Sequence, residues 1–389
     1  MALKRWIALL NAIFMLAAVA SCWGEGAGTF APRRLPHWFP YRQGWLGADG
    51  AYSVPLGKGR SLWFFDDTFV GAPAATSRKQ TPAFIHNSVG ISTCSGKDCS
   101  LRYFWAGGSS AKPGPIFVAP GSDWFWPLDA FIHDGTLYVA LMQMHAAGSG
   151  AFGFAYSGSQ LASIRNYTAP PSQWSIVYQQ LNTGGRAVPG ISIVADQGPG
   201  GNPDPVNPNG ASYAYFFTAV GSPPYLALLR IPLNELNRLA RPGNADWQYL
   251  SKRGAWQPWK DTATTLPADN AAVIRPGATE MTVRYHRSTR QWLAVYPLGL
   301  GRQAYYALSS SLTSGWGPSE SLYSYPEMQP SNPNHTPNVF CYAVKEHVEF
   351  ETPGRLFFTY VCNSRVEKDI VDNMNLYHPI VVTQRLPTK

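Results

Sequence analysis

The feature that most constrains the fold is a pattern of short apolar strands that recurs five times along the chain. Each copy opens with a strand that carries a polar or acidic residue, and a strand rich in Tyr, Val, Ala and Phe follows. The copies begin near residues 61, 128, 190, 277 and 337. A repeated unit of this size is typical of β-propellers, whose four-stranded blades need about 40–50 residues plus loops. The sequence therefore predicts an all-β, five-bladed propeller, and a two-sheet sandwich is the alternative.

Composition supports short strands and many turns. Hydrophobic residues make up 45% of the 389-residue chain, which excludes a disordered protein. The 36 Gly and 33 Pro, with only 14% charged residues, exclude coiled coils and helical solenoids. The sequence HDGT at 133–136 has the Asp-Gly pair of a two-residue hairpin turn. Innermost strands are expected near Asp67, Asp129, Ile193, Glu280 and Tyr342.

The N-terminal sequence is typical of an export signal. Lys4 and Arg5 precede the apolar run 6–20, which is shorter than the ~20 residues of a membrane span. Two processing sites fit: an A-x-A sequence that ends at Ala20, and a bacterial lipobox in which Cys22 carries the lipid. We expect a protein that is secreted or lipid-anchored at the bacterial cell envelope, with no other contact to the membrane.

The chain divides into three segments on this interpretation. Residues 1–22 are the signal peptide with its possible lipobox, 23–58 form an N-terminal extension, and 59–389 form the propeller. The extension is rich in Gly and Pro and could close the ring beside the last blade. We expect a monomer.

Four cysteines remain if Cys22 carries lipid, and they fall into two local pairs. Cys94 and Cys99 flank a tight turn, and Cys341 and Cys362 could join two neighbouring strands. Exported proteins can keep such disulfides oxidised. We therefore predict the bridges Cys94–Cys99 and Cys341–Cys362.

Several functions lack support in the sequence. The formal net charge is +8, but the basic residues are scattered, so no nucleic-acid partner is expected. The chain contains no phosphate-binding loop, no nucleophile elbow and no zinc-ligand template. We expect no cofactor and no metal, and a polysaccharide as the partner.

Acidic residues near the starts of the repeats are the candidate catalytic groups. Asp66 or Asp67, Asp129 and Glu280 are each flanked by apolar residues, in WFFDDTF, FWPLDAF and ATEMTV. Innermost strands of a propeller line its central channel, so carboxylates distant in sequence can converge on one pocket. Asp66 and Asp67 are adjacent on a strand and face opposite sides, so only one can point into that pocket. A structural role in tying blades together is the alternative for each.

Aromatic and polar residues surround these acids. Trp63, Trp124 and Trp126 have faces that could stack on sugar rings, although packing between blades is the alternative role. Candidate polar groups for substrate binding are Asn87, Arg284 and His347.

Several segments resemble one bacterial family. LWFFDDTFVG, WPLDAFIHDGTLYVAL, GATEMTVRYHRSTRQWLAVY and GWGPSESLYSYPE resemble, in order, the blades of the family called domain of unknown function 4185, over about residues 55–387. The resemblance implies a five-bladed propeller distantly similar to arabinanase and xylosidase propellers. Some members are glycoside hydrolases of family 183, endo-acting on the D-arabinan of mycobacterial cell walls. The aspartate of the family's opening motif falls on Asp67, with Asp66 where glycine is usual. Asp129 and Glu280 match acidic positions of later blades.

We interpret the chain as an exported glycoside hydrolase that acts on a cell-wall or furanoside polysaccharide such as D-arabinan. Glycosidases need one carboxyl group as general acid and another as base or nucleophile. Asp67 is assigned as base or nucleophile and Glu280 as acid. Asp129 would position the substrate or raise the pKa of the acid, and Asp129 and Glu280 could exchange roles. A carbohydrate-binding propeller without catalysis and a lipid-anchored surface scaffold are the alternatives.

Overall fold

The computed structural model describes residues 31–388 except for 36–37, 81, 96–97, 108–111, 151, 183–186, 196–212, 239–246 and 260–265. The predicted signal peptide and Cys22 lie outside the described residues, so their assignment stays a prediction. In the part of the chain that is described, no helix reaches the length and hydrophobicity that a membrane span requires.

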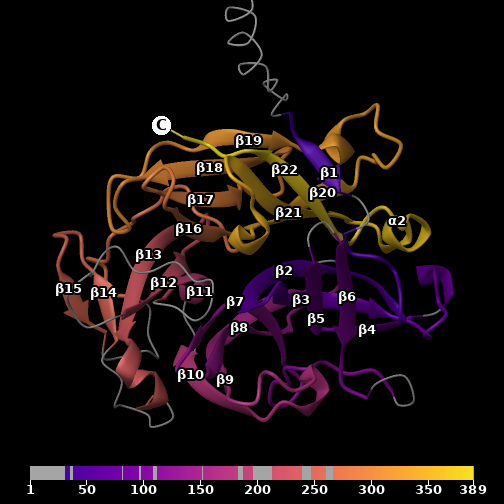
Figure 1. The fold of residues 1–389 in the computed structure, drawn as a ribbon, viewed down its shortest axis with the longest axis horizontal. Helices are drawn as coiled ribbons and strands as arrows, with labels where there is room; N and C mark the ends of the chain where they lie inside the picture. Colours follow the sequence, from indigo (N-terminus) through magenta and orange to yellow (C-terminus); the bar gives the residue numbers. More distant parts are fainter. Residues whose placement is uncertain are drawn as a thin grey trace, which may run out of the picture.

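The strands form five antiparallel sheets that are arranged as blades around a centre (Figure 1). The first blade holds β2 (Trp45–Gly57), β3 (Arg60–Val70), β5 (Ser88–Ser95) and β6 (Asp98–Phe104), with β4 (Ala83–Ile85) beside β3. The second holds β7 (Trp124–His133), β8 (Thr136–Ala146), β9 (Phe154–Ile164) and β10 (Ile176–Asn182). The third holds β11 (Ala187–Val194), β12 (Tyr213–Val220), β13 (Tyr225–Pro232), β14 (Gln248–Leu250) and β15 (Trp256–Pro258).

The last two blades complete the ring. The fourth holds β16 (Thr282–His286), β17 (Gln291–Pro297), β18 (Gln303–Ser309) and β19 (Glu320–Ser324). The fifth holds β20 (Val339–Glu346), β21 (Arg355–Ser364), β22 (Pro379–Arg385) and β1 (Arg33–Leu35). One short helix, α2 (Glu367–Asp372), follows β21 in the described chain. Short 3₁₀ turns lie at Arg78–Gln80, Pro171–Gln173, Leu233–Arg238, Pro326–Met328 and Val348–Phe350.

Five innermost strands line the centre. β2 contacts β7, β7 contacts β11, β11 contacts β16, β16 contacts β20, and β20 contacts β2 again. This closed circuit makes the protein a five-bladed β-propeller, as the sequence predicted. Because blades stack face against face, their middle strands are buried on both sides; in β12 six consecutive residues are buried. That burial explains the apolar strands of the repeats.

The innermost strand of the first blade precedes the first repeat identified in the sequence. Asp129, Ile193 and Tyr342 lie on the innermost strands β7, β11 and β20, as expected, and Glu280 lies just before β16. Asp67 lies on β3, the second strand of its blade. The innermost strand there is β2, within the 23–58 stretch that the sequence assigned to an extension.

The predicted hairpin turn joins β7 to β8. His133 pairs with Thr136, and between them Asp134 and Gly135 have φ angles of 44° and 67°. Two consecutive positive φ angles are what a type I′ turn requires.

The N-terminal strand closes the ring. β1 adds antiparallel to β22, so the last blade is built from both ends of the chain (Figure 1). Arg34 of β1 forms a 2.6 Å ion pair with Glu327, a fully buried residue that also accepts a 2.9 Å hydrogen bond from the Tyr360 hydroxyl. The buried carboxylate therefore anchors the N-terminal strand to blade five.

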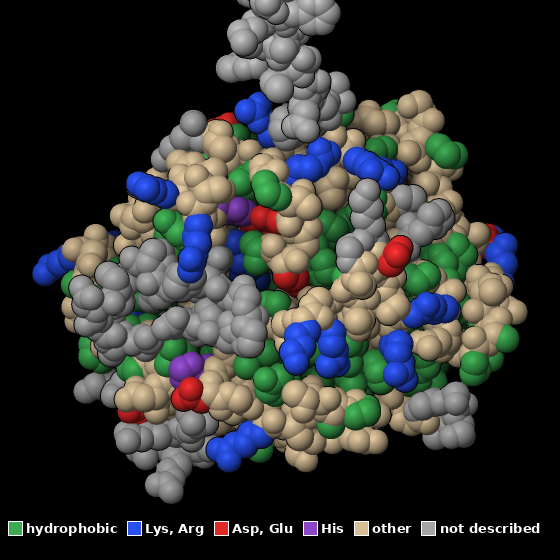
Figure 2. Space-filling model, viewed as in Figure 1, with side chains coloured by type: hydrophobic (Ala, Val, Ile, Leu, Met, Phe, Trp, Pro, Cys, Tyr) green, Lys and Arg blue, Asp and Glu red, His purple; other side chains and the backbone are tan. Residues whose placement is uncertain are grey.

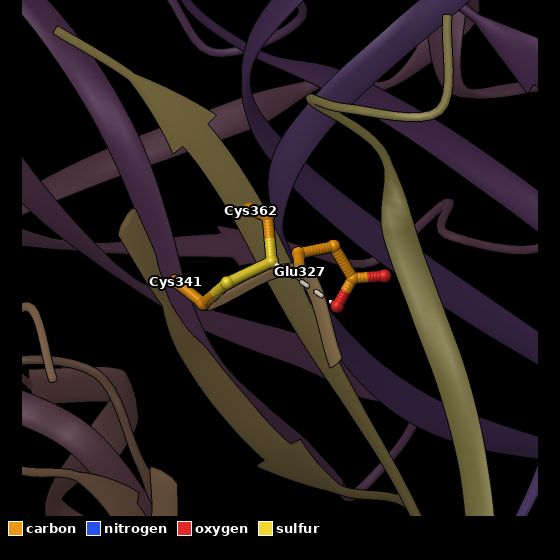
Figure 3. A group of neighbouring side chains, drawn as sticks. All are labelled: Glu327, Cys341 and Cys362. Atoms are coloured by element: carbon orange, nitrogen blue, oxygen red, sulfur yellow. Dashed lines mark hydrogen bonds between the residues drawn. A yellow bond between two sulfur atoms is a disulfide. The ribbon is translucent and has the colours of Figure 1, made fainter. Parts of the chain in front are cut away.

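Both predicted disulfides are present. Cys94–Cys99 joins the paired strands β5 and β6, and Cys341–Cys362 joins β20 and β21, each with Cα atoms 4.0 Å apart. Figure 3 shows the second bridge beside Glu327. Disulfides persist in oxidising compartments, so the two bridges indicate an extracellular or periplasmic protein.

Candidate functional site

A cavity of about 900 Å³ lies where residues of blades one, two, four and five meet. Five carboxyl groups line it: those of Asp49, Asp66 and Asp67 in the first blade, Glu280 just before β16, and Glu367 at the start of α2. Figure 2 shows acidic side chains near the middle of the ring, set among hydrophobic ones. The first blade supplies three of the five, because β2 and β3 are antiparallel partners and Gly50, next to Asp49, pairs with Phe65, next to Asp66.

Asp67 is the carboxylate with the best hydrogen-bond support. Its Oδ1 accepts hydrogen bonds from Trp126 Nε1 at 2.9 Å and from His86 Nδ1 at 2.8 Å. The His86 ring stacks on Trp124, with ring centroids 4.4 Å apart. Donors aimed at one oxygen stabilise the ionised form and fix its orientation. Asp67 therefore presents a carboxylate of fixed orientation to the cavity.

Asp49 and Asp66 form a close acidic pair beside it. Asp49 Oδ2 accepts a 2.5 Å hydrogen bond from the Tyr342 hydroxyl, whereas Asp49 Oδ1 and Asp66 Oδ1 are buried with no partner among the described residues. Burial, followed by the neighbouring carboxylates, raises the pKa of both groups well above the ordinary value. The pair therefore holds protons more tightly than ordinary carboxyl groups do.

A glycine permits the close packing of this pair. Gly50 has a φ of 78°, and a Cβ at that position would lie 2.8 Å from Asp66 Oδ2. The backbone between Asp49 and Ala51 thus runs directly against the Asp66 carboxyl group, which a larger residue would displace.

Glu280 forms an ion pair with Lys345, a buried lysine beside the cavity. Lys345 Nζ donates to Glu280 Oε1 at 3.0 Å, and the same nitrogen lies 4.4 Å from the centroid of the Tyr52 ring. Lys345 is fully buried, whereas the Glu280 side chain is 18% exposed and lines the cavity. The ammonium therefore fixes the position of the Glu280 carboxyl group at the cavity.

Asp129 occupies a different position. It is fully buried, does not line the cavity, and forms a two-point ion pair with Arg284, with both N–O distances 2.9 Å. Ser192 Oγ and the Ile193 amide also donate to it, at 3.2 and 2.7 Å. Asp129 therefore links blades two, three and four, and the structure does not bring it or Arg284 into the cavity with Asp67 and Glu280.

The other residues that we expected to bind substrate fall into two groups, those at the cavity and those buried elsewhere in the blades. Trp126 lines the cavity, and Trp124 supports His86 behind it. Three residues are fully buried and bonded within blades or between them: Trp63 with Ser92, Asn87 with the backbone of Phe117 and Phe125, and His347 with Ser53 and Thr359.

Sequence reasoning missed several polar residues of the cavity region, among them Asp49, Tyr342 and Lys345. Asp49 lay in the presumed extension, Tyr342 was named only as a strand marker, and Lys345 was not considered. The run WLGADGAYSVPL around Asp49 has the strand-like apolar residues that could have identified it.

Comparison with known protein families assigns the chain to one of them. The family model described as "Domain of unknown function (DUF5005)" matches residues 33–382. The chain belongs to this family. The match does not confirm membership of family 4185, which the sequence motifs resemble. No curated protein matches the chain.

Solved structures share the fold of this DUF5005 protein. A putative hydrolase from Bacteroides ovatus superposes with a TM-score of 0.65 and 16% identity, over 88% of this chain and 86% of that one. A GH62 hydrolase in complex with xylotriose has a TM-score of 0.45 and 12% identity, covering 87% and 92%. A GH43_1 enzyme from Xanthomonas citri complexed with xylotriose has a TM-score of 0.41 and 14% identity, covering 88% and 87%. At these identities the first likeness shows the propeller fold.

Proposed function

We propose that this protein is a glycoside hydrolase whose chemistry takes place in this carboxylate-lined cavity. The observation that carries the proposal is the contrast between Asp67, whose Oδ1 accepts hydrogen bonds from two N–H donors, and Asp49, whose pKa is raised by burial and by the neighbouring carboxylates. Glycoside hydrolysis needs one carboxyl group of each kind. Pairs of acids whose surroundings drive their pKa values apart are the usual sign of acid and base roles.

The roles differ from those that the sequence suggested. Asp67 remains the base or nucleophile. Asp49 becomes the general acid, because burial and the neighbouring carboxylates raise its pKa, whereas Glu280 Oε1 is already occupied by Lys345 Nζ. Glu280 then binds substrate hydroxyl groups, and Asp129 supports the site indirectly by fixing Arg284.

The rim of the cavity suits a sugar chain. Phe84, Phe152 and Leu300 line it and remain 47%, 51% and 40% exposed. Apolar faces beside carboxylates and a tryptophan are the combination that stacks on sugar rings and binds their hydroxyls. A furanoside polysaccharide such as the D-arabinan of cell walls is the proposed substrate, which also suits a secreted or lipid-anchored protein with two disulfides.

The test is hydrolysis of D-arabinan, L-arabinan and xylan, followed by chromatography of the released oligosaccharides. The wild type should cleave one of them, and Asp49→Asn should lose that activity. Asp98→Asn, on an exposed position of β6, is the matched control and should keep it. Binding of a polysaccharide without cleavage by the wild type would replace the enzyme with a carbohydrate-binding propeller.

A further inference from the structure

A second cluster of titratable side chains lies outside the cavity, between blades four and five. His286 is the last residue of β16, Glu346 is the last residue of β20, and Glu351 follows the 3₁₀ turn after β20. None of the three lines the cavity. Each offers one ligand atom, and these atoms lie within 4.8 Å of one another.

The imidazole faces a carboxylate on each side. His286 Nε2 lies 2.6 Å from Glu346 Oε1, and Nδ1 lies 3.6 Å from Glu351 Oε2. A neutral imidazole carries only one N–H, so it cannot donate to both carboxylates. One of its nitrogens is thus free to use its lone pair on a cation.

One carboxylate oxygen of Glu346 lacks a hydrogen-bond partner among the described residues. Its side chain is fully buried, and its Oε2 has no hydrogen-bond partner within the described chain. A buried carboxylate oxygen without a partner is costly, because it has lost water and gained nothing in return. A cation at this point would remove that cost.

The nearby cations are already committed. Arg284 forms its two-point pair with Asp129, and Lys345 pairs with Glu280. Glu346 and Glu351 both face the His286 imidazole, one at each ring nitrogen. A metal ion beside this imidazole would therefore supply the positive charge that Arg284 and Lys345 do not provide.

We propose that His286, Glu346 and Glu351 form a structural site for a divalent transition-metal ion, with Zn²⁺ as the representative. One imidazole nitrogen and two carboxylates are a donor set that zinc accepts, with water as a fourth ligand. Ca²⁺ prefers six to eight oxygen ligands, so the imidazole disfavours it. One atom of each residue lies within 4.8 Å of the other two, so small side-chain shifts would bring all three to the roughly 3.4 Å spacing of ligands around one zinc ion. The ion joins the ends of β16 and β20 and so locks blade four to blade five.

The spacing of these ligands explains why the sequence gave no metal signal. Sixty residues separate His286 from Glu346, since the two lie on innermost strands of successive blades. Metal templates read from sequence rely on ligands only a few residues apart. Here the fold, and not a local motif, brings the ligands together.

The experiment uses the folded full-length protein after treatment with EDTA and dialysis. Isothermal titration with Zn²⁺ should give one site per chain, and the metal at 100-fold excess over Kd should raise Tm by roughly 3–5 °C. Glu346→Gln and Glu351→Gln should each weaken binding by at least about tenfold. Glu320→Gln, an exposed glutamate on β19, is the matched control and should bind as the wild type does.

Either of two results would overturn the proposal. One is a wild type that shows neither heat nor a Tm shift with Zn²⁺ or Mn²⁺, or responds to Ca²⁺ alone. The other is unchanged Zn²⁺ binding in both Gln variants. If these variants do not fold, Co²⁺ added to the wild type keeps the proposal testable. Its visible absorption should report nitrogen and oxygen ligands at one site, and a spectrum identical to aqueous Co²⁺ would refute the site.

Discussion

The hydroxyl of Tyr342 on β20 donates a 2.5 Å hydrogen bond to Asp49 Oδ2 on β2, joining the fifth blade to the first at the wall of the cavity. This bond stabilises the ionised form of Asp49 and so lowers its pKa. Burial and the carboxylates of Asp67 and Glu280 act in the opposite direction and prevail. Removing this hydrogen bond should therefore raise the pKa of Asp49, the proposed general acid.

Tyr342→Phe should raise the pKa of Asp49 further. A hydrogen bond to a charged group contributes about 1.5–3 kcal/mol, and one pKa unit corresponds to about 1.4 kcal/mol. The basic limb of the pH profile of kcat/KM, which requires protonated Asp49, should therefore move upward by about one unit or more. Tyr306→Phe removes a comparable hydroxyl, bonded to Glu320 at the surface, and should leave the profile in place. A downward shift in Tyr342→Phe would contradict the assignment of Asp49 as the acid.

Asp67→Asn should reduce turnover by at least about 10³-fold while sparing folding and sugar binding. The amide keeps the shape of the carboxylate but can neither accept a proton nor attack carbon. Hydrolysis rates and isothermal titration with a resistant oligosaccharide separate the two effects. An unchanged rate would remove Asp67 from the mechanism. Loss of activity in Asp66→Asn with Asp67→Asn active would move the role to its neighbour.

The fold was predictable because each repeat in the sequence corresponds to strands of one blade. Blade formation depends on short, doubly buried strands and tight turns, and both leave local signals such as the Asp134-Gly135 turn. β2 was missed because Gly47, Gly50 and Pro55 interrupt its apolar pattern, and the register with β3 shifts several times.

The site was only partly predictable, because its acids look alike in sequence. Asp129 and Glu280 both stand among apolar residues, yet the first is bound by Arg284, 155 residues away, and the second by Lys345, 65 residues away. Which acid is neutralised and which is left for chemistry depends on these distant partners. The pairing of Asp49 with Tyr342, across 293 residues, is of the same kind.

Asp129→Asn should destabilise the protein more than it impairs chemistry. Arg284 would keep its charge in a buried position while facing an amide, and breaking a buried ion pair from one side costs about 3–5 kcal/mol. Denaturant unfolding should show this loss, whereas hydrolysis per folded molecule should stay within about tenfold. Asp98→Asn at the surface should change neither quantity. A fall of 10³-fold in turnover at unchanged stability would return Asp129 to the catalytic group.

Asp66→Asn should stabilise the protein at alkaline pH. Asp66 has a raised folded-state pKa, so between its unfolded pKa near 4 and that raised value the folded state binds more protons than the unfolded state. Stability therefore falls as pH rises through this window, by up to about 1.4 kcal/mol per pH unit for one group. Asparagine has no proton to hold, so this dependence should be weaker in the variant.

The comparison is made by denaturant unfolding at pH 4, 6 and 8. Asp66→Asn and the wild type should be nearly equal at pH 4, where both side chains are neutral, and should diverge with the variant more stable as pH rises. Asp49, Asp67, Glu280 and Lys345 also act on this carboxyl group, so part of the slope will remain in the variant. Asp372→Asn is the control of opposite sign: bonds from Lys368 and Lys79 lower the pKa of this exposed carboxyl. A steeper loss of stability in Asp66→Asn than in the wild type would show that Asp66 is ionised in the folded protein, and the protonated pair beside Asp67 would have to be abandoned.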